Sequence, residues 1–204
     1  MQTGMNETDH KSHSLHLHLP GTLDLREFVA LMSALMAMTA LSIDTMLPAL
    51  PDIGRELHVL HANDRQLIIT TFFLGLAGGA LFYGPLADHH GRRPVLLGAL
   101  VLMLVSTLLC TFASSFQLLL IGRFLAGFYA AAGRVLVLSI VRDCYKGDMM
   151  ARIMSLIMFT FMIVPMMAPA LGAGILALAQ WRWIFGLLAI LVGALALWVG
   201  LRLP

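Results

Sequence analysis

Charged residues are scarce in this chain, and their scarcity excludes most soluble folds. Of its 204 residues only 12% are Asp, Glu, Lys or Arg, whereas 59% are hydrophobic, and the mean hydropathy is +0.87. A soluble domain carries about 25% charged residues. The composition therefore places the chain among membrane proteins. A net charge of +2 also gives no reason to expect a nucleic-acid partner.

Cysteine is nearly absent, since Cys110 and Cys144 are the only two in the sequence. On the topology predicted below they lie toward opposite membrane faces, which excludes a disulfide between them. The sequence also lacks a zinc-ligand spacing, an embedded Ser/His pair, an embedded His-x-x-x-His pair and paired carboxylates. We therefore expect neither an enzyme nor a bound metal or cofactor.

Residues 1–27 lack the layout of a cleaved signal peptide, because the apolar stretch that follows begins too late and runs too long. The segment is polar and contains His10, His13, His16 and His18. These histidines could bind a metal, but an unstructured cytoplasmic tail is the better interpretation of such a composition.

Long uncharged stretches, in contrast, are frequent. No Asp, Glu, Lys or Arg occurs between Arg65 and Asp88, or between Arg93 and Arg123. Such runs are as long as the roughly 20 apolar residues that cross a bilayer. We predict an all-α integral membrane protein in which residues 28–204 form a six-helix bundle. The predicted spans are 28–50, 66–87, 94–113, 118–141, 153–177 and 183–202.

The distribution of Lys and Arg predicts the orientation of these spans. With the N-terminus inside, eight basic residues lie on the cytoplasmic side and three on the outer side, so both termini are expected in the cytoplasm. The cytoplasmic set is Lys11, Arg26, Arg92, Arg93, Arg142, Lys146, Arg152 and Arg202, and the outer set is Arg55, Arg65 and Arg182.

Three charged residues, Asp44, Arg123 and Arg134, fall inside the predicted spans, where a charge marks a functional site by default. Asp44 and Arg123 are both expected roughly 8–9 Å below the outer surface, so they can pair or line a cavity. The alternative is that each reaches the outer interface by itself. Arg134 lies within roughly 20° of the same helix face as Arg123, which indicates a cationic stripe along a watered cavity.

Span 153–177 carries Met154, Met158, Met162 and Met166 at every fourth position. Flexible thioethers suit a surface that accepts varied apolar ligands, so Met158 and Met162 are candidate substrate contacts. Ordinary packing is the favoured interpretation of this row, and Cu(I) binding is the least favoured.

The stretch G-P-L-A-D-H-H-G-R-R-P-V-L, Gly84 to Leu96, resembles the signature loop between helices 2 and 3 of the major facilitator superfamily. The family form is Gly-x-Leu-Ala-Asp-Arg-x-Gly-Arg-Lys/Arg-x-x-Leu, and only His89 departs from it at a strongly typed position. The segment L-S-I-D-T-M-L-P-A-L-P, Leu41 to Pro51, is similar to the end of helix 1 in Bcr/CflA-type drug:proton antiporters. Further similarities lie at R-F-L-A-G (123–127), V-R-D (141–143), P-M-M-A-P-A-L-G-A-G (165–174) and W-R-W-I-F (181–185).

One position in the fourth predicted span, 118–141, departs from the pattern of this branch. Members of the branch commonly carry an Arg near position 138. Here that residue is Leu138, and an Arg occurs about one turn earlier, at Arg134. The departure leaves the substrate class open.

The resemblance implies twelve helices in two six-helix halves, of which this chain corresponds to the N-terminal half. It also implies proton-coupled export of small amphipathic compounds, of the bicyclomycin or chloramphenicol class, by alternating access in the inner membrane. The expected partners are a small-molecule substrate, protons, membrane lipid, and either a C-terminal six-helix half or a second copy of the chain. The alternatives are an importer of sugars or metabolites on the same fold and a six-helix fragment that does not transport.

Asp44 and Arg123 would then couple proton movement to transport, and Arg134 with the two central methionines would line the cavity. The resemblance implies an antiporter motif in span 153–177, which contains Pro165 and Pro169. Each proline removes a backbone hydrogen bond, so the alternative is that the span is merely kinked and has no antiporter role. The cytoplasmic gate is expected to contain Gly84, Asp88, Gly91, Arg92, Arg93 and Asp143, with a bridge from Arg92 to Asp143. The antiporter motif of helix 5 comprises Pro165, Pro169, Gly172 and Gly174.

Overall fold

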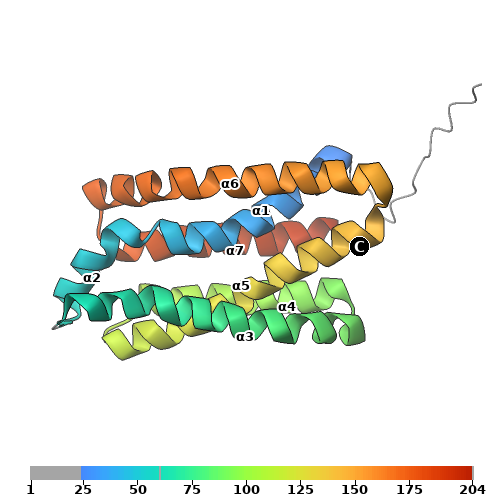
Figure 1. Cartoon of the computed structure of the whole chain (residues 1–204). Coiled ribbons are helices and arrows are strands. Elements are labelled where there is room, and N and C mark those ends of the chain that lie inside the picture. Colours follow the sequence, from blue (N-terminus) through green and yellow to red (C-terminus); the bar gives the residue numbers. More distant parts are fainter. Residues whose placement is uncertain (1–23, 60, 204) are drawn as a thin grey trace, which may run out of the picture.

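The computed structural model describes residues 24–59 and 61–203 as a bundle of helices (Figure 1). Within these ranges six helical segments are long and apolar enough to cross a membrane, which confirms the predicted fold class. The expected polar tail lies outside the described residues, except for its last four. The α-helices are α1 (Leu25–Asp44), α2 (Leu50–Glu56), α3 (Leu67–His90), α4 (Arg92–Thr111), α5 (Phe116–Cys144), α6 (Gly147–Leu178) and α7 (Arg182–Arg202), and two 3-10 helices, η1 (Leu47–Ala49) and η2 (Ala62–Gln66), flank α2.

The first span differs from the predicted single helix over 28–50. Regular α-helix ends at Asp44, and the chain continues through η1 and α2 as far as Glu56. Pro48 and Pro51 lie in the first turns of η1 and α2, where the missing N–H of proline interrupts the helical hydrogen bonds. The break therefore places Asp44 at a helix end rather than within a helix.

The remaining spans overlap their predicted ranges, and several of them, including α3 and α6, are longer than predicted. Helix α3 continues through Pro85 to His90, and α6 begins at Gly147, six residues before the predicted start. The α3–α4 turn is a single residue, Gly91, whose φ of 86° lies in the region that favours glycine. A tight reversal between two long antiparallel helices follows from this one residue.

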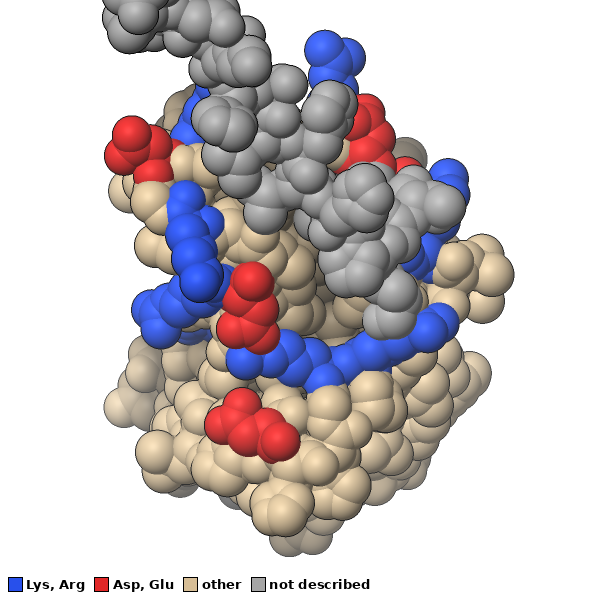
Figure 2. All heavy atoms as spheres, turned by 90° about the vertical axis from the view of Figure 1, so that its right-hand side faces the viewer, with Lys and Arg blue, Asp and Glu red and all other residues tan. Residues whose placement is uncertain are grey.

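The two ends of the bundle differ in charge. The α3–α4 turn, the first residues of α1 and α6, and the last residues of α5 and α7 share one end, which we call the basic end. Figure 2 shows a band of Lys and Arg across this end, with a few acidic side chains among them. The other end, called the opposite end below, holds α2 and the α4–α5 and α6–α7 turns.

Helices α3 and α4 pack on α5, and α6 packs on α1 (Figure 1). Helix α7 packs mainly on α4 and less extensively on α1, and α1 also contacts α5. Glycines permit the closest of these contacts: a Cβ on Gly75 or Gly79 of α3 would overlap the backbone of α5, and one on Gly127 would overlap the Phe72 carbonyl. Small residues at a helix interface drive association where lipid supplies no hydrophobic force.

Candidate functional site

Arg123 is the most deeply buried charge in the described chain, with 1% of its surface exposed. Its guanidinium donates to the Ser42 carbonyl at 2.9 Å and, more weakly, to the Ile68 carbonyl at 3.5 Å. Its Cζ atom also lies 4.3 Å from the centroid of the Phe72 ring and 5.8 Å from that of Phe185. The positive charge is thus balanced by carbonyl dipoles and aromatic faces, as a desolvated guanidinium can be.

The expected Asp44–Arg123 ion pair is therefore wrong for this structure. Within the described residues no ion pair joins the two side chains, and Arg123 instead bonds the carbonyl two residues before Asp44. The reason is the helix end: the last carbonyls of α1 lack partners from their own helix, and a nearby cation binds them. Asp44 itself is half-buried at the end of α1.

Gly172 of α6 packs directly against the same helix end. A Cβ at this position would overlap the Thr45 carbonyl and lie 3.1 Å from Pro48 Cγ. Gly174, two residues further, is open, because a Cβ placed there would have no atom within 4 Å. Of the two motif glycines, only Gly172 is required for the approach of α6 to the break in α1. Pro165 and Pro169 lie half-buried within α6, which stays helical through both.

The predicted cationic stripe divides into two environments. Arg134 is exposed and lines a cavity of about 400 Å³ between α3 and α5, whereas Arg123 is almost completely buried. The Cζ atom of Arg134 lies 5.7 Å from the centroid of the Phe161 ring on α6. The structure therefore supports a cavity for Arg134 alone, and the expectation of one continuous watered stripe is wrong.

The methionine row of α6 does not form a single surface. Residues four apart advance by about 40° around a helix, so that the row drifts across the face. Met154 and Met158 are half-buried against the core, whereas Met162 and Met166 are 72% and 81% exposed. Met158 thus packs within this bundle, while Met162 projects from it.

At the basic end, the structure brings together two of the residues expected in the gate. Arg92 Nη2 lies 2.7 Å from Asp143 Oδ2, so the first turn of α4 is joined to the last turn of α5. Arg93 donates to the Gly200 carbonyl at 2.9 Å, which joins α4 to α7. The predicted Arg92–Asp143 contact is present, and its role as a gate stays a prediction.

The other gate residues are not part of this contact. Asp88 is exposed on the last turns of α3, and among the described residues no ion pair includes it. Gly84 is open, with no atom near its missing side chain, while Gly91 forms the α3–α4 turn. The expected cluster is thus reduced to the Arg92–Asp143 pair.

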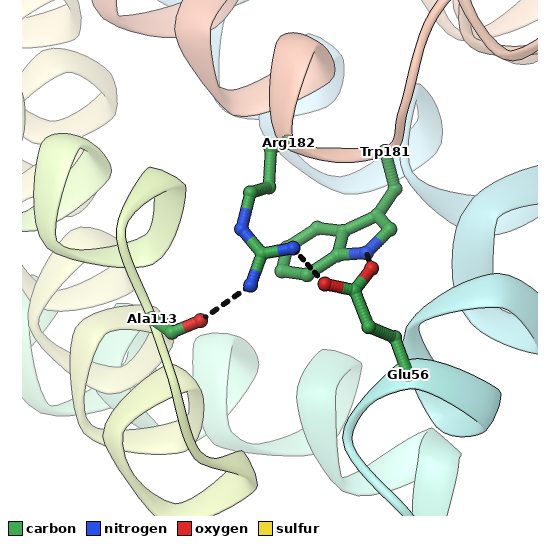
Figure 3. Close-up of polar contacts among 4 residues, drawn as sticks. All are labelled: Glu56, Ala113, Trp181 and Arg182. Atoms are coloured by element: carbon green, nitrogen blue, oxygen red, sulfur yellow. Dashed lines mark hydrogen bonds and ion pairs between the residues drawn. The ribbon is translucent and has the colours of Figure 1, made fainter.

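Sequence reasoning missed a polar cluster at the opposite end (Figure 3). The Glu56 carboxylate at the end of α2 accepts hydrogen bonds from Trp181 Nε1 and from Arg182 Nη1 at the start of α7. Arg182 Nη2 also donates to the Ala113 carbonyl at 2.9 Å, beyond the end of α4. One carboxylate and one guanidinium thereby join three helix ends, and the W-R-W stretch was the only sequence signal that pointed to them.

A similar contact joins α1 to α7 at the basic end. Glu27 Oε1 accepts from Trp198 Nε1 at 3.2 Å and pairs with Arg202 Nε at 3.0 Å. Helix α7 is therefore bonded to other elements near both of its ends.

Comparison with known proteins now identifies the fold. The profile described as "Major Facilitator Superfamily" matches residues 31–204, most of the chain. The chain belongs to the major facilitator superfamily. A solved member of this fold, the in meso crystal structure of the POT family transporter PepTSo, is similar with a TM-score of 0.75 at 18% identity, over 89% of this chain and 39% of that one.

Curated relatives within the superfamily agree with the expected Bcr/CflA type. An uncharacterized MFS-type transporter, YdgK of Bacillus subtilis (strain 168), is 38% identical over 92% of this chain and 47% of its own. The bicyclomycin resistance protein homolog of Haemophilus influenzae is 32% identical over 83% and 42%, and the multidrug resistance protein MdtL of Salmonella paratyphi B is 36% identical over 86% and 45%. The chain thus spans about half the length of the relatives it matches, and the superfamily consists of transporters rather than enzymes.

Proposed function

We propose that this chain forms the N-terminal half of a proton-coupled exporter of small amphipathic compounds. Relatives named for bicyclomycin and multidrug resistance support export of such compounds. The basic end would face the cytoplasm, in accordance with the preference of Lys and Arg for that side. The second half would be six further helices, supplied by the same polypeptide or by a second copy.

The observation that carries the proposal is the position of Asp44 at the break in α1. It is the only acidic residue inside the six predicted spans, and three elements meet beside it. Arg123 of α5 bonds the Ser42 carbonyl on one side of it, and Gly172 of α6 packs on the Thr45 carbonyl on the other. A change in the charge of Asp44 would therefore act on the junction of α1, α5 and α6.

In the proposed cycle, Asp44 takes a proton from the outer side and releases it inward while substrate moves outward. The two halves rock about a site near the midplane, as in other transporters built from repeats. The pair of Arg92 and Asp143 would hold the basic end closed in the outward-open state. Partly exposed pairs of this kind contribute only about 0–1 kcal/mol, so such a latch opens easily.

The proposal is tested by Asp44→Asn in the complete transporter, reconstituted in proteoliposomes with a pH-sensitive dye inside. We expect substrate-driven proton movement to be abolished while membrane insertion is retained, because an amide cannot exchange a proton. Asp52→Asn provides the control, since Asp52 is also an acid near this helix break but pairs with Arg55 outside the packed junction. Wild-type proton movement in the Asp44 variant would contradict the assignment.

The alternative import function predicts the reverse direction of transport. Cells that lack their own drug efflux should become less susceptible when they express the exporter, and should accumulate less of a fluorescent substrate. Greater accumulation would instead support an importer. If neither drug susceptibility nor substrate accumulation changes when both halves are present, the chain is a six-helix fragment that does not transport.

A further inference from the structure

A groove at the basic end runs between the first halves of α1 and α6. Its volume is about 680 Å³, and all the residues that line it belong to these two helices. Arg26, in the first turn of α1, and Arg152, in the second turn of α6, lie on its walls. Most of the other lining residues are apolar, including Val29, Ala34 and Leu156.

The groove opens on the flank of the bundle, away from the cavity beside Arg134. Phe161, the contact of Arg134 on α6, follows Arg152 by nine residues, which at about 100° per residue places them on roughly opposite sides of the helix. Ala34 also lines a neighbouring apolar groove of about 340 Å³ between α1 and α7. The two grooves therefore continue along the same flank, which faces lipid in a membrane-spanning bundle.

The chemistry of the groove changes with depth. Its guanidinium groups lie nearest the basic end, whereas Ser33 and Thr160 lie about two turns deeper on their helices, or roughly 10–12 Å. Ser33 Oγ is buried and has no hydrogen-bond partner among the residues that the structure describes. The groove thus offers positive charge at its mouth, an apolar wall, and one unused hydroxyl within.

Within residues 24–59 and 61–203 no ion pair joins Arg26 or Arg152 to an acid. Glu27, beside Arg26, is bonded to Trp198 and Arg202 of α7, and neither Asp24 nor Asp148 lines the groove. Figure 2 shows the same preponderance of basic side chains across this end of the molecule.

We propose that this groove binds an anionic phospholipid from the leaflet at the basic end. The phosphate lies between Arg26 and Arg152, and an acyl chain follows the apolar wall of α1 and α6. Guanidinium groups pair with phosphate oxygens in a bidentate geometry. A ligand with a phosphate group is therefore favoured in this groove over a purely apolar ligand. The proposal rests on the membrane-spanning fold and not on the export of drugs.

The test measures lipid binding by the purified full chain in detergent, with native mass spectrometry as the readout. The probes are phosphatidylglycerol and phosphatidylcholine with identical acyl chains, and inorganic phosphate alone. The variants are R26Q/R152Q, which removes the charge of the mouth, and Ala30→Phe, which fills the groove without changing charge. Arg142→Gln is the matched control, because Arg142 is an exposed arginine at the same end outside the groove.

We expect phosphatidylglycerol to bind more tightly than phosphatidylcholine, and R26Q/R152Q to weaken its binding by about 10- to 30-fold. Ala30→Phe should weaken it as well, and Arg142→Gln should leave it nearly unchanged. Equal loss in R142Q and R26Q/R152Q, or equal binding of the two lipids, would overturn the proposal. So would inorganic phosphate that binds as tightly as the lipid, since the site would then be one for a free anion. If R26Q/R152Q does not fold, Ala30→Phe remains a test of the groove, and unchanged binding of phosphatidylglycerol by this variant would overturn the proposal.

Discussion

Arg123 shows how a single buried charge can hold a helix end. Helix α1 ends at Asp44, so its last carbonyls have no amide partners within the helix. Thr45 satisfies the Leu41 carbonyl, and Arg123 donates to the carbonyl of Ser42. A guanidinium from α5 thus completes the C-terminus of α1, where the helix dipole favours positive charge.

We expect Arg123→Leu to destabilise the bundle by about 2 kcal/mol, because it removes a charged hydrogen bond to a buried carbonyl. Arg123→Lys should destabilise it less, since an ammonium group keeps the charge but not the stacking on Phe72. Thermal unfolding in detergent, followed by the reactivity of the buried Cys110, measures both changes.

Arg134→Leu is the control for this prediction, because Arg134 is exposed on the same helix. Its effect on unfolding should be small. If Arg134→Leu destabilised the bundle as much as Arg123→Leu, the effect would not depend on the hydrogen bond to the Ser42 carbonyl. That result would contradict the proposal that Arg123 caps the end of α1.

The sequence indicated that these charges matter but not what they contact. Asp44, Arg123 and Arg134 stand out because charges are rare in apolar spans. The partner of Arg123 is a backbone carbonyl, and residue types do not show which backbone groups lack partners. This carbonyl is free only because the helix ends at Asp44. Pairing an acid with a base at equal depth was therefore one natural expectation, and this structure does not contain that pair.

At the scale of helices, the approach of α6 to the break in α1 depends on one glycine. We expect Gly172→Ala to cost about 1–3 kcal/mol, because the added methyl group would overlap the Thr45 carbonyl. Gly172→Leu should weaken transport more than expression. Gly174→Ala provides the matched control on the same helix, and its stability should stay near that of the parent chain. Stability and transport in the complete protein are measured in parallel, and equal effects of the two alanine variants would contradict a specific contact at Gly172.

The existence of the helices could be predicted, but several of their ends could not. Long apolar stretches with few or no charges marked all six spans, since a bilayer-spanning segment needs only composition and length. The path through η1 and α2 to Glu56 depends on how Pro48 packs beside Gly172 of α6, which is a tertiary contact. The methionines divide between the core and the surface because a period of four does not match the turn of an α-helix.

For the whole molecule, the Arg92–Asp143 pair joins α4 to α5 at the basic end, where the proposed latch acts during transport. We expect Arg92→Asp and Asp143→Arg each to reduce transport, and the two together to restore much of it, because the swapped charges can pair again. Transport of a fluorescent substrate by the complete protein is the measurement. The combination of Arg93→Asp with Asp143→Arg is the control, since Arg93 bonds the Gly200 carbonyl and has no acid to exchange with. Failure of the first double variant would count against a direct pair.

Long-range contacts account for most of what the sequence did not reveal at this scale. The Glu56–Trp181 bond joins residues 125 positions apart, and no local pattern encodes such a partner. The α3–α4 turn, in contrast, was recognisable because its glycine and its polar residues lie next to one another. The Arg92–Asp143 contact was predicted only through a resemblance, and the contacts of Glu56 were not predicted at all.

The bonds at both ends of α7 have a consequence for the order in which the protein is made. A ribosome completes α1 and α2 long before α7, so Glu27 and Glu56 enter the membrane without Trp198, Arg202, Trp181 and Arg182. The bonds of Glu56 can form only after Arg182 has been made, and those of Glu27 only after Arg202. The contacts at both ends of α7 are thus among the last contacts of this bundle to form during synthesis.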